Sequence, residues 1–265
     1  MKKSTSICII LLLFTVMISC HRQQRNEIET VIISGKVTDF DGLPVDSSIV
    51  EIKNPDFTTA YETYTDQSGN YSLKVEKGKY MAMYAMRPKE YPRANAVPKE
   101  DMKLEFWAWN IVADKDLTIN PRYHKLEIYG TNVFKVRGGP RTLFVYFRPM
   151  SVTKLVSYSE DILLNKSRAQ KISDISVQPE NLEVKIYADD HLLKINSIQP
   201  IEEYPGEGNI PMLGYIAQVE APETTTDSRY MILRIVAENK ELGEKGENLY
   251  FYELDHYRSE PAMGK

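Results

Sequence analysis

The stretch that decides the fold covers residues 34–85 and reads SGKVTDFDGLPVDSSIVEIKNPDFTTAYETYTDQSGNYSLKVEKGKYMAMYA. Apolar and polar residues alternate in short runs, as in SIVEIKN at 48–54 and YSLKV at 71–75. This period of two is typical of strands that bury one face. The runs end in turn sequences such as DFDGLP at 39–44 and DQSGN at 66–70. Short strands joined by glycine-containing turns predict an all-β fold built as antiparallel sandwiches.

The turn residues have predictable roles in this pattern. We expect the turn glycines to adopt a positive φ, which glycine reaches without steric cost, and the turn aspartates to accept hydrogen bonds from backbone amides. These aspartates are also possible calcium ligands, but they are divided between two turns and lack the oxygen spacing of an EF-hand loop. The residues concerned are Gly42, Gly69, Gly78, Asp39, Asp41 and Asp66.

Two longer segments, GKVTDFDGLPVDSSIVEIKN at 35–54 and TYTDQSGNYSLKVEKGKYMAMY at 63–84, resemble the carboxypeptidase regulatory-like domain. The resemblance implies a small sandwich of transthyretin (prealbumin) topology without catalytic activity, and it fades after Met86. The matching positions are Gly35, Val37, Asp39, Gly42, Pro44, Val45, Thr65, Asp66, Gly69, Tyr71, Leu73, Val75, Gly78 and Tyr80.

The segment KLEFWAWNIV at 103–112 contains the two tryptophans of the chain, Trp107 and Trp109. Residues two apart on a strand point to the same face, so both indoles are expected on one side of the sheet. If that face is buried, they belong to the core. If it is exposed, they make a platform for sugar rings, and we name both as candidate ligand-binding residues.

The chain divides into two predicted units. KLEIYGTNVFKV at 125–136 is expected to close a first sandwich over residues 31–136, and RGGP at 137–140 is a predicted hinge. A second, immunoglobulin-like sandwich is expected over 141–255, with a helix or a polar crossover at 158–170. RYMILRIVAENKELG at 229–243 resembles the penultimate strand of fibronectin type III domains. The predicted strands of this unit are 142–149, 151–158, 172–179, 182–188, 214–222, 229–239 and 248–254.

The N-terminus predicts export. Lys2 and Lys3 precede an apolar run at 7–18, which is shorter than the roughly 20 residues that span a bilayer. Residues 1–19 are therefore read as a cleaved signal peptide, rather than as an uncleaved anchor. VMISC at 16–20 resembles the lipobox of bacterial lipoproteins, although Met17 stands where leucine is preferred. The resemblance implies that Cys20 is acylated and anchors the protein in the lipid bilayer, whereas an ordinary secretory signal would leave no anchor.

Cysteine content and net charge further limit the class of protein to which the chain can belong. The only cysteines are Cys8, inside the signal, and Cys20, so the mature body can form no intramolecular disulfide. Removing residues 1–19 takes away two lysines and no acid, which changes the net charge from −4 to −6. An acidic mature protein lacks the excess of basic residues that is typical of nucleic-acid-binding proteins. Residues 20–30 are expected to be a polar tether and 256–265 a tail.

No motif specifies a reaction. The sequence lacks a phosphate-binding loop, a Gly-x-Ser-x-Gly elbow and a Cys-x-x-Cys pair. HKLE at 124–127 has the His-x-x-Glu spacing of zinc carboxypeptidases, with His256 as a distant third ligand. Strand alternation, however, points His124 and Glu127 to opposite faces. We therefore predict no enzyme, no catalytic residue, no metal site and no cofactor.

The whole arrangement resembles lipoproteins of the Bacteroidota, many of them encoded beside outer-membrane glycan-uptake systems. The resemblance implies a non-enzymatic accessory protein at the outer membrane that binds a polysaccharide or an outer-membrane partner protein. The alternative is a structural or assembly lipoprotein that acts as a spacer or docking surface without a ligand. Which face of the membrane it occupies stays open, although HRQQRN at 21–26 lacks acidic residues and favours the periplasmic side.

Overall fold

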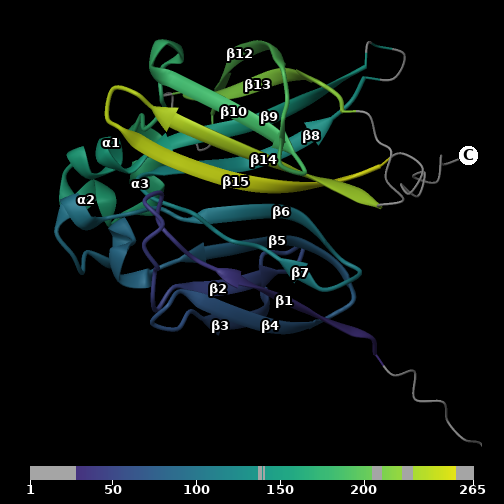
Figure 1. Ribbon diagram of the computed structural model, residues 1–265. Helices are drawn as coiled ribbons and strands as arrows, with labels where there is room; N and C mark the ends of the chain where they lie inside the picture. The colour runs from purple at the N-terminus through teal and green to yellow at the C-terminus, as the bar shows by residue number, and fades with distance from the viewer. Residues whose placement is uncertain (1–27, 137–138, 140, 205–210, 223–228, 255–265) are drawn as a thin grey trace, which may run out of the picture.

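The computed structural model describes residues 28–136, 139, 141–204, 211–222 and 229–254. Strands dominate it and form three sheets that are stacked as two sandwiches (Figure 1). Most neighbouring strands are antiparallel, and two of the ladders are parallel. The prediction of an all-β sandwich fold is therefore confirmed.

A long sheet of eight strands runs through both sandwiches. The first sandwich uses one half of it and the second sandwich uses the other half. The two halves join where β15 pairs in parallel with β6, with Asn248 opposite Trp107 and Tyr250 opposite Trp109. The order in the sheet is β11 (His191–Leu192), β10 (Leu182–Ala188), β14 (Tyr230–Asn239), β15 (Glu244–Glu253), β6 (Phe106–Ala113), β5 (Gly78–Met86), β2 (Ile49–Lys53) and β3 (Thr59–Tyr64).

A small sheet covers the first half of the long sheet. Its strands are β4 (Asn70–Glu76), β1 (Thr30–Lys36) and β7 (Leu117–Thr118), in that order. Alternate residues of β1 and β4, such as Val31, Ile33, Leu73 and Val75, point into the first core. The alternation noted in the sequence is thus the alternation of buried and exposed side chains along these strands.

A four-stranded sheet covers the second half of the long sheet. Its order is β12 (Ile195–Glu203), β13 (Met212–Glu220), β9 (Thr142–Ser151) and β8 (Leu126–Phe134). One expectation is wrong here, because 126–134 was assigned to the first sandwich. Leu126, Ile128 and Val133 pack in the second core instead, since β8 forms an antiparallel ladder with β9. The predicted limits of the two units, 31–136 and 141–255, otherwise stay a prediction.

The two covering sheets lie on opposite faces of the long sheet. Ala108 and Phe251 point into the first core, whereas Tyr252 points into the second core. Neighbouring residues on a strand face opposite sides, so the two cores must lie on opposite sides of the same sheet. Each half of the long sheet is therefore covered on one face only. On each face the covering sheet ends near the β15–β6 junction, and we call each of these two places a step.

Helices occupy the connections at one end of the molecule (Figure 1). The proline-rich excursion after β5 forms η1 (Pro88–Glu90), η2 (Pro92–Ala94) and η3 (Lys99–Asp101), and η4 (Pro179–Asn181) precedes β10. Residues 151–158 were predicted as a strand, but α1 (Val152–Ser157) forms there because the Ser151 side chain caps it by accepting from the Lys154 amide. α2 (Glu160–Leu163) and α3 (Lys166–Ile172) follow, which confirms the helical alternative at 158–170.

The turn predictions are confirmed at two of three glycines. Gly42 has a φ of +82° and Gly69 a φ of +78°, whereas Gly78 opens β5 without a positive φ. Asp39 Oδ1 accepts hydrogen bonds from two amides of its turn, and Asp66 Oδ1 does the same at its own turn. These carboxylates therefore stabilise the hairpins in the way that the sequence predicts.

Several predictions fall outside the described residues. They are the signal peptide at 1–19, Cys20, most of the tether at 20–30, most of the hinge at 137–140, His256 and the tail at 256–265. None of the helices in the described part of the chain is long and apolar enough to cross a membrane.

Candidate functional site

An aromatic corner lies at the first step, where the four-stranded sheet ends at β8. We define this corner as Tyr84, Trp107, Trp109, Tyr129 and Arg148. Tyr84 lies on β5 and the tryptophans on β6, on the face that the small sheet leaves bare. Tyr129 lies on β8, the edge strand of the four-stranded sheet, and Arg148 lies opposite it on the neighbouring β9. The corner thus combines side chains of both sandwiches.

The rings of the aromatic corner form one continuous stack. Trp107 and Trp109 are parallel, with 4.8 Å between ring centroids and 13° between planes. Tyr84 lies 5.3 Å from Trp107 on the other side. Tyr129 stands edge-on to both indoles, at 5.5 Å from Trp107 and 5.4 Å from Trp109. Offset and edge-to-face contacts of this kind add stability beyond the buried area.

Strand register and one bulge produce this stack. Tyr84 is opposite Trp107 in the β5–β6 ladder, and the tryptophans are two residues apart, so all three rings share a face. The β8–β9 register shifts between Tyr129 and Asn132, at a bulge where Gly130 has a φ of +66°. Bulges redirect neighbouring side chains, and this one places Tyr129 against the indoles.

The two tryptophans differ in exposure. Trp107 is 6% exposed, whereas Trp109, Tyr84 and Tyr129 are half-buried. The expected shared face of the indoles is therefore present, but Trp107 is mainly a core residue and Trp109 is the indole that reaches the surface. Their binding of a ligand stays a prediction.

Two carboxyl groups lie beneath the rings. Glu127 is 4% exposed, and its Oε1 accepts a hydrogen bond from Trp107 Nε1 at 3.0 Å. Burial, together with the nearby Glu105 carboxyl, raises the pKa of Glu127 well above its usual value. Burial also raises the pKa of Glu105 to about 7, against the opposing charge of Arg93. A protonated Glu105 or Glu127 therefore supports Trp107 at neutral pH without a full buried charge.

A polar rim borders the aromatic corner. The Arg148 guanidinium lies over the Tyr129 ring, 5.3 Å from its centroid, and its Nη1 donates to Glu203 Oε2 at 2.8 Å. A Cβ on Gly214 would lie 2.2 Å from Glu203 Oε1, so a larger residue there would move this carboxylate. Within the described residues, the buried atoms Trp109 Nε1 and Arg148 Nε have no hydrogen-bond partner.

The two described members of the His-x-x-Glu motif have different environments, and His256 lies outside the described residues. Glu127 bonds the Trp107 indole, while His124 is half-buried and burial lowers its pKa. No group of three or more potential metal ligands occurs among the residues that the structure describes.

Sequence reasoning identified Trp107 and Trp109 but missed the other members of the corner. Tyr84 had a usable signal, because it lies on an alternating strand of the segment that resembles the regulatory-like domain. Tyr129 and Arg148 had none, since the β8 bulge and the pairing of β8 with β9 are tertiary features.

Comparisons with known proteins do not assign a family. No family model matches the chain, and no curated protein matches it. Among solved structures, a DUF3823 family protein from Bacteroides ovatus is 15% identical, with 83% of this chain and 98% of that chain covered and a TM-score of 0.26. A provisionally assigned carbohydrate-binding protein from Bacteroides uniformis is 11% identical, with 84% and 99% covered and a TM-score of 0.27. The major pilin subunit BcpA of Bacillus cereus is 11% identical, with 84% and 69% covered and a TM-score of 0.25. At these TM-scores the similarities establish no function for the chain.

Proposed function

We propose that the protein is a non-enzymatic, lipid-anchored accessory protein of the outer membrane that binds polysaccharide at the aromatic corner. The observation that carries the proposal is the ordered ring stack, which ends at the half-buried Trp109. Aromatic faces pack against the apolar faces of sugar rings, and a few polar groups fix their orientation. Arg148 and Glu203 are the polar groups at this corner.

The rigidity of the corner favours binding. Trp109 is held between the buried Trp107 and the edge of Tyr129, and Tyr129 is held by Arg148. A surface whose side chains are already ordered loses little conformational entropy when a ligand binds. The rings come from both sandwiches, so a bound chain would contact both of them.

A second candidate is a structural lipoprotein that acts as a spacer without a ligand. The shared eight-stranded sheet favours it, because a ladder that continues from one sandwich into the other joins them stiffly. The two candidates differ in what happens when the exposed indole is removed.

We expect Trp109→Ala to weaken polysaccharide binding at least tenfold, because a large aromatic anchor at the centre of a contact contributes more than 1.4 kcal/mol. The measurement is affinity electrophoresis of the intact mature protein in gels that contain neutral plant or microbial polysaccharides. Trp109→Phe keeps a ring and should retain part of the binding. Tyr64→Ala, at an exposed tyrosine of β3, serves as the matched control.

Two results would contradict this function. One is a parent protein that no polysaccharide retards. The other is a Trp109→Ala protein that migrates as the parent does. Either result would support the spacer.

Anchoring is tested at Cys20. We expect Cys20→Ala to release the protein from the membrane fraction, because acylation supplies the apolar chains that hold a lipoprotein at the bilayer. Fractionation and detergent partitioning of cells that express each form measure the distribution. A Cys20→Ala protein that remains wholly in the membrane would show that another segment anchors it. Protease treatment of intact cells distinguishes the periplasmic from the external face.

A further inference from the structure

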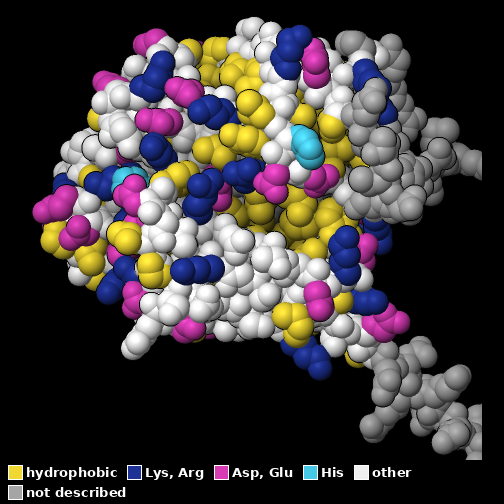
Figure 2. Space-filling view, viewed as in Figure 1, with side chains coloured by type: hydrophobic (Ala, Val, Ile, Leu, Met, Phe, Trp, Pro, Cys, Tyr) yellow, Lys and Arg dark blue, Asp and Glu magenta, His cyan; other side chains and the backbone are white. Residues whose placement is uncertain are grey.

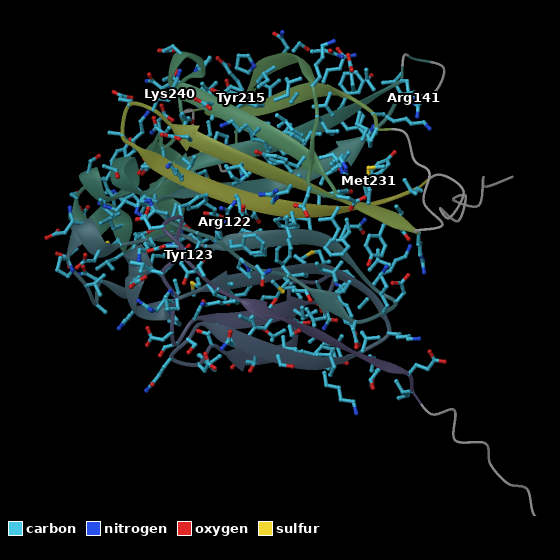
Figure 3. The ribbon with its side chains drawn as sticks, in the orientation of Figure 1. Arg122, Tyr123, Arg141, Tyr215, Met231 and Lys240 are labelled. Carbon is cyan, nitrogen blue, oxygen red and sulfur yellow. The ribbon has the colours of Figure 1, made fainter. Side chains whose placement is uncertain are left out.

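The second step of the long sheet forms a cleft between the two sandwiches. A cavity of about 620 Å³ lies there, which is within the range of small-molecule sites. Hydrophobic side chains gather at the junction of the upper and lower parts of the molecule in Figure 2, with acidic and basic side chains along the border. Arg122, labelled in Figure 3, lies between the sandwiches. Each sandwich contributes part of the lining.

The cleft exists because the small sheet is narrow. Its last strand, β7, has two residues, so β14 and β15 keep a bare face beyond it. Gly35 allows the segment after β7 to approach β1 closely, since a Cβ there would lie 1.8 Å from the Ile119 carbonyl oxygen. The backbone amide of Lys36 also donates to Asn120 Oδ1 at 2.9 Å. The wall of the cleft is therefore fixed by backbone contacts.

A buried carboxylate and two arginines occupy the centre of the cleft. Glu247 is 4% exposed, and its Oε2 accepts from Arg122 Nε at 3.1 Å and from Arg122 Nη2 at 2.5 Å. Arg122 also lies over the Phe40 ring, at 4.9 Å from its centroid. Arg234 lies over Tyr187 at 4.3 Å, and its Nη2 donates to Asp190 Oδ1 at 3.0 Å.

Each guanidinium thus contacts a ring and donates to a carboxylate. An arginine has five N–H donors, and these contacts use only some of them. Arg122 and Arg234 are also shared with an adjoining hollow of about 360 Å³, so the cleft continues along the face of β14. The arrangement is a set of ordered donors and acceptors along a groove.

Charge decides the class of ligand. The cavity is lined by three basic residues, Lys36, Arg122 and Arg234, and by three acidic residues, Asp189, Asp190 and Glu247. The adjoining hollow adds two lysines and two glutamates. The groove therefore has no net charge, and an ionic ligand would displace existing pairs. A neutral ligand with many hydroxyl groups can bond to both signs and leave the pairs in place, while Ile119, Ile232 and Leu249 supply apolar contact.

We propose that this cleft is a second binding site and that it takes a short neutral oligosaccharide. It lies on the opposite face of the long sheet from the aromatic corner, so the two sites are occupied independently. This cleft rests on the proposed function, to which it adds a second carbohydrate site and a preference for uncharged sugars.

The test is titration calorimetry of the mature protein with cellotriose, maltotriose, xylotriose and mannotriose, and with trigalacturonate as the charged comparison. We expect at least one neutral trisaccharide to bind and trigalacturonate to bind at least tenfold more weakly. Thr118 lines the cavity and is exposed, so Thr118→Trp should fill the cleft and weaken trisaccharide binding at least tenfold without removing a buried contact. Ser72→Trp, at an exposed position of β4, is the matched control and should bind as the parent does. Thermal melting checks that both variants are folded.

Several results would overturn the proposal. They are the absence of binding by all four neutral trisaccharides, equal binding of trigalacturonate, and a folded Thr118→Trp protein that binds as the parent does. Trp109→Ala is included so that the two sites are separated. If Trp109→Ala abolishes trisaccharide binding and Thr118→Trp leaves it unchanged, the ligand occupies the aromatic corner, so the cleft proposal fails and the proposed function stands.

Discussion

Trp107→Ala is expected to lower the free energy of unfolding by about 3–5 kcal/mol, the usual cost of truncating a large core aromatic residue. Trp107 is 6% exposed and contacts the rings of Tyr84, Trp109 and Tyr129, so its removal leaves a cavity in the middle of the stack. It also removes the indole N–H that Glu127 accepts. A buried acceptor without a donor adds to the loss.

Urea unfolding followed by circular dichroism measures this effect. Trp107→Phe keeps an aromatic ring and removes only the N–H and part of the volume, so it should cost less than alanine. Tyr64→Ala, at a side chain that is 54% exposed, is the control and should change stability by no more than about 0.5 kcal/mol. A loss below about 1 kcal/mol in Trp107→Ala would show that the indole is not part of the core.

The second large effect is a decrease in stability as the pH rises from about 5 to about 8. Burial raises the pKa of Glu105 from 4.5 to about 7, and it raises the pKa of Glu127 as well. The folded state then binds more protons than the unfolded state between these pH values, so stability is greatest below about pH 5 and falls through pH 7. For Glu105 alone the shift corresponds to roughly 3 kcal/mol.

Glu105→Gln should flatten this dependence and make the protein more stable than the parent at pH 8. Unfolding midpoints in urea from pH 5 to pH 8 measure it, and Glu62→Gln, at an exposed position of β3, is the control. The exposed Asp46, Asp56 and Asp66 have lowered pKa values because of hydrogen bonds, so they act below pH 4, outside this window. A Glu105→Gln profile parallel to that of the parent would exclude this carboxyl as the cause.

Both effects concern the support beneath the aromatic corner rather than its exposed ring. Trp107 and its two carboxyls hold Trp109 in place, and Trp109 is the residue expected to touch a ligand. Variants of the support should therefore change stability first, whereas Trp109→Ala should change binding. This difference separates a structural role from a binding role at two positions of β6 that are two residues apart.

The local structure of this protein could be predicted from short sequence patterns. Alternation of apolar residues predicted the strands around Leu73 and Val75, and the turn sequences predicted the positive φ of Gly42 and Gly69. It also predicted that Trp107 and Trp109 share a face. These features depend on neighbouring residues, because the period of a strand and the conformational range of glycine act over a few positions.

Local patterns were less reliable where a few residues decide between structures. α1 replaced a predicted strand because Ser151 caps it, and β12 was missed because Pro200 interrupts a polar segment. β12 is an edge strand, and an edge tolerates proline because one side of the strand needs no partner.

The pairing of the strands could not be predicted from these local patterns. The β15–β6 ladder joins residues as distant as Trp107 and Asn248, and it makes one sheet out of two predicted units. The pairing of β8 with β9 moves Tyr129 and Arg148 to the tryptophans, and the narrow small sheet leaves the cleft around Arg122 and Glu247. The alternation of residues along a strand indicates which face is buried, but it does not indicate which strand or sheet covers that face. Sites at the ends of covering sheets therefore depend on packing between residues that are far apart in the sequence.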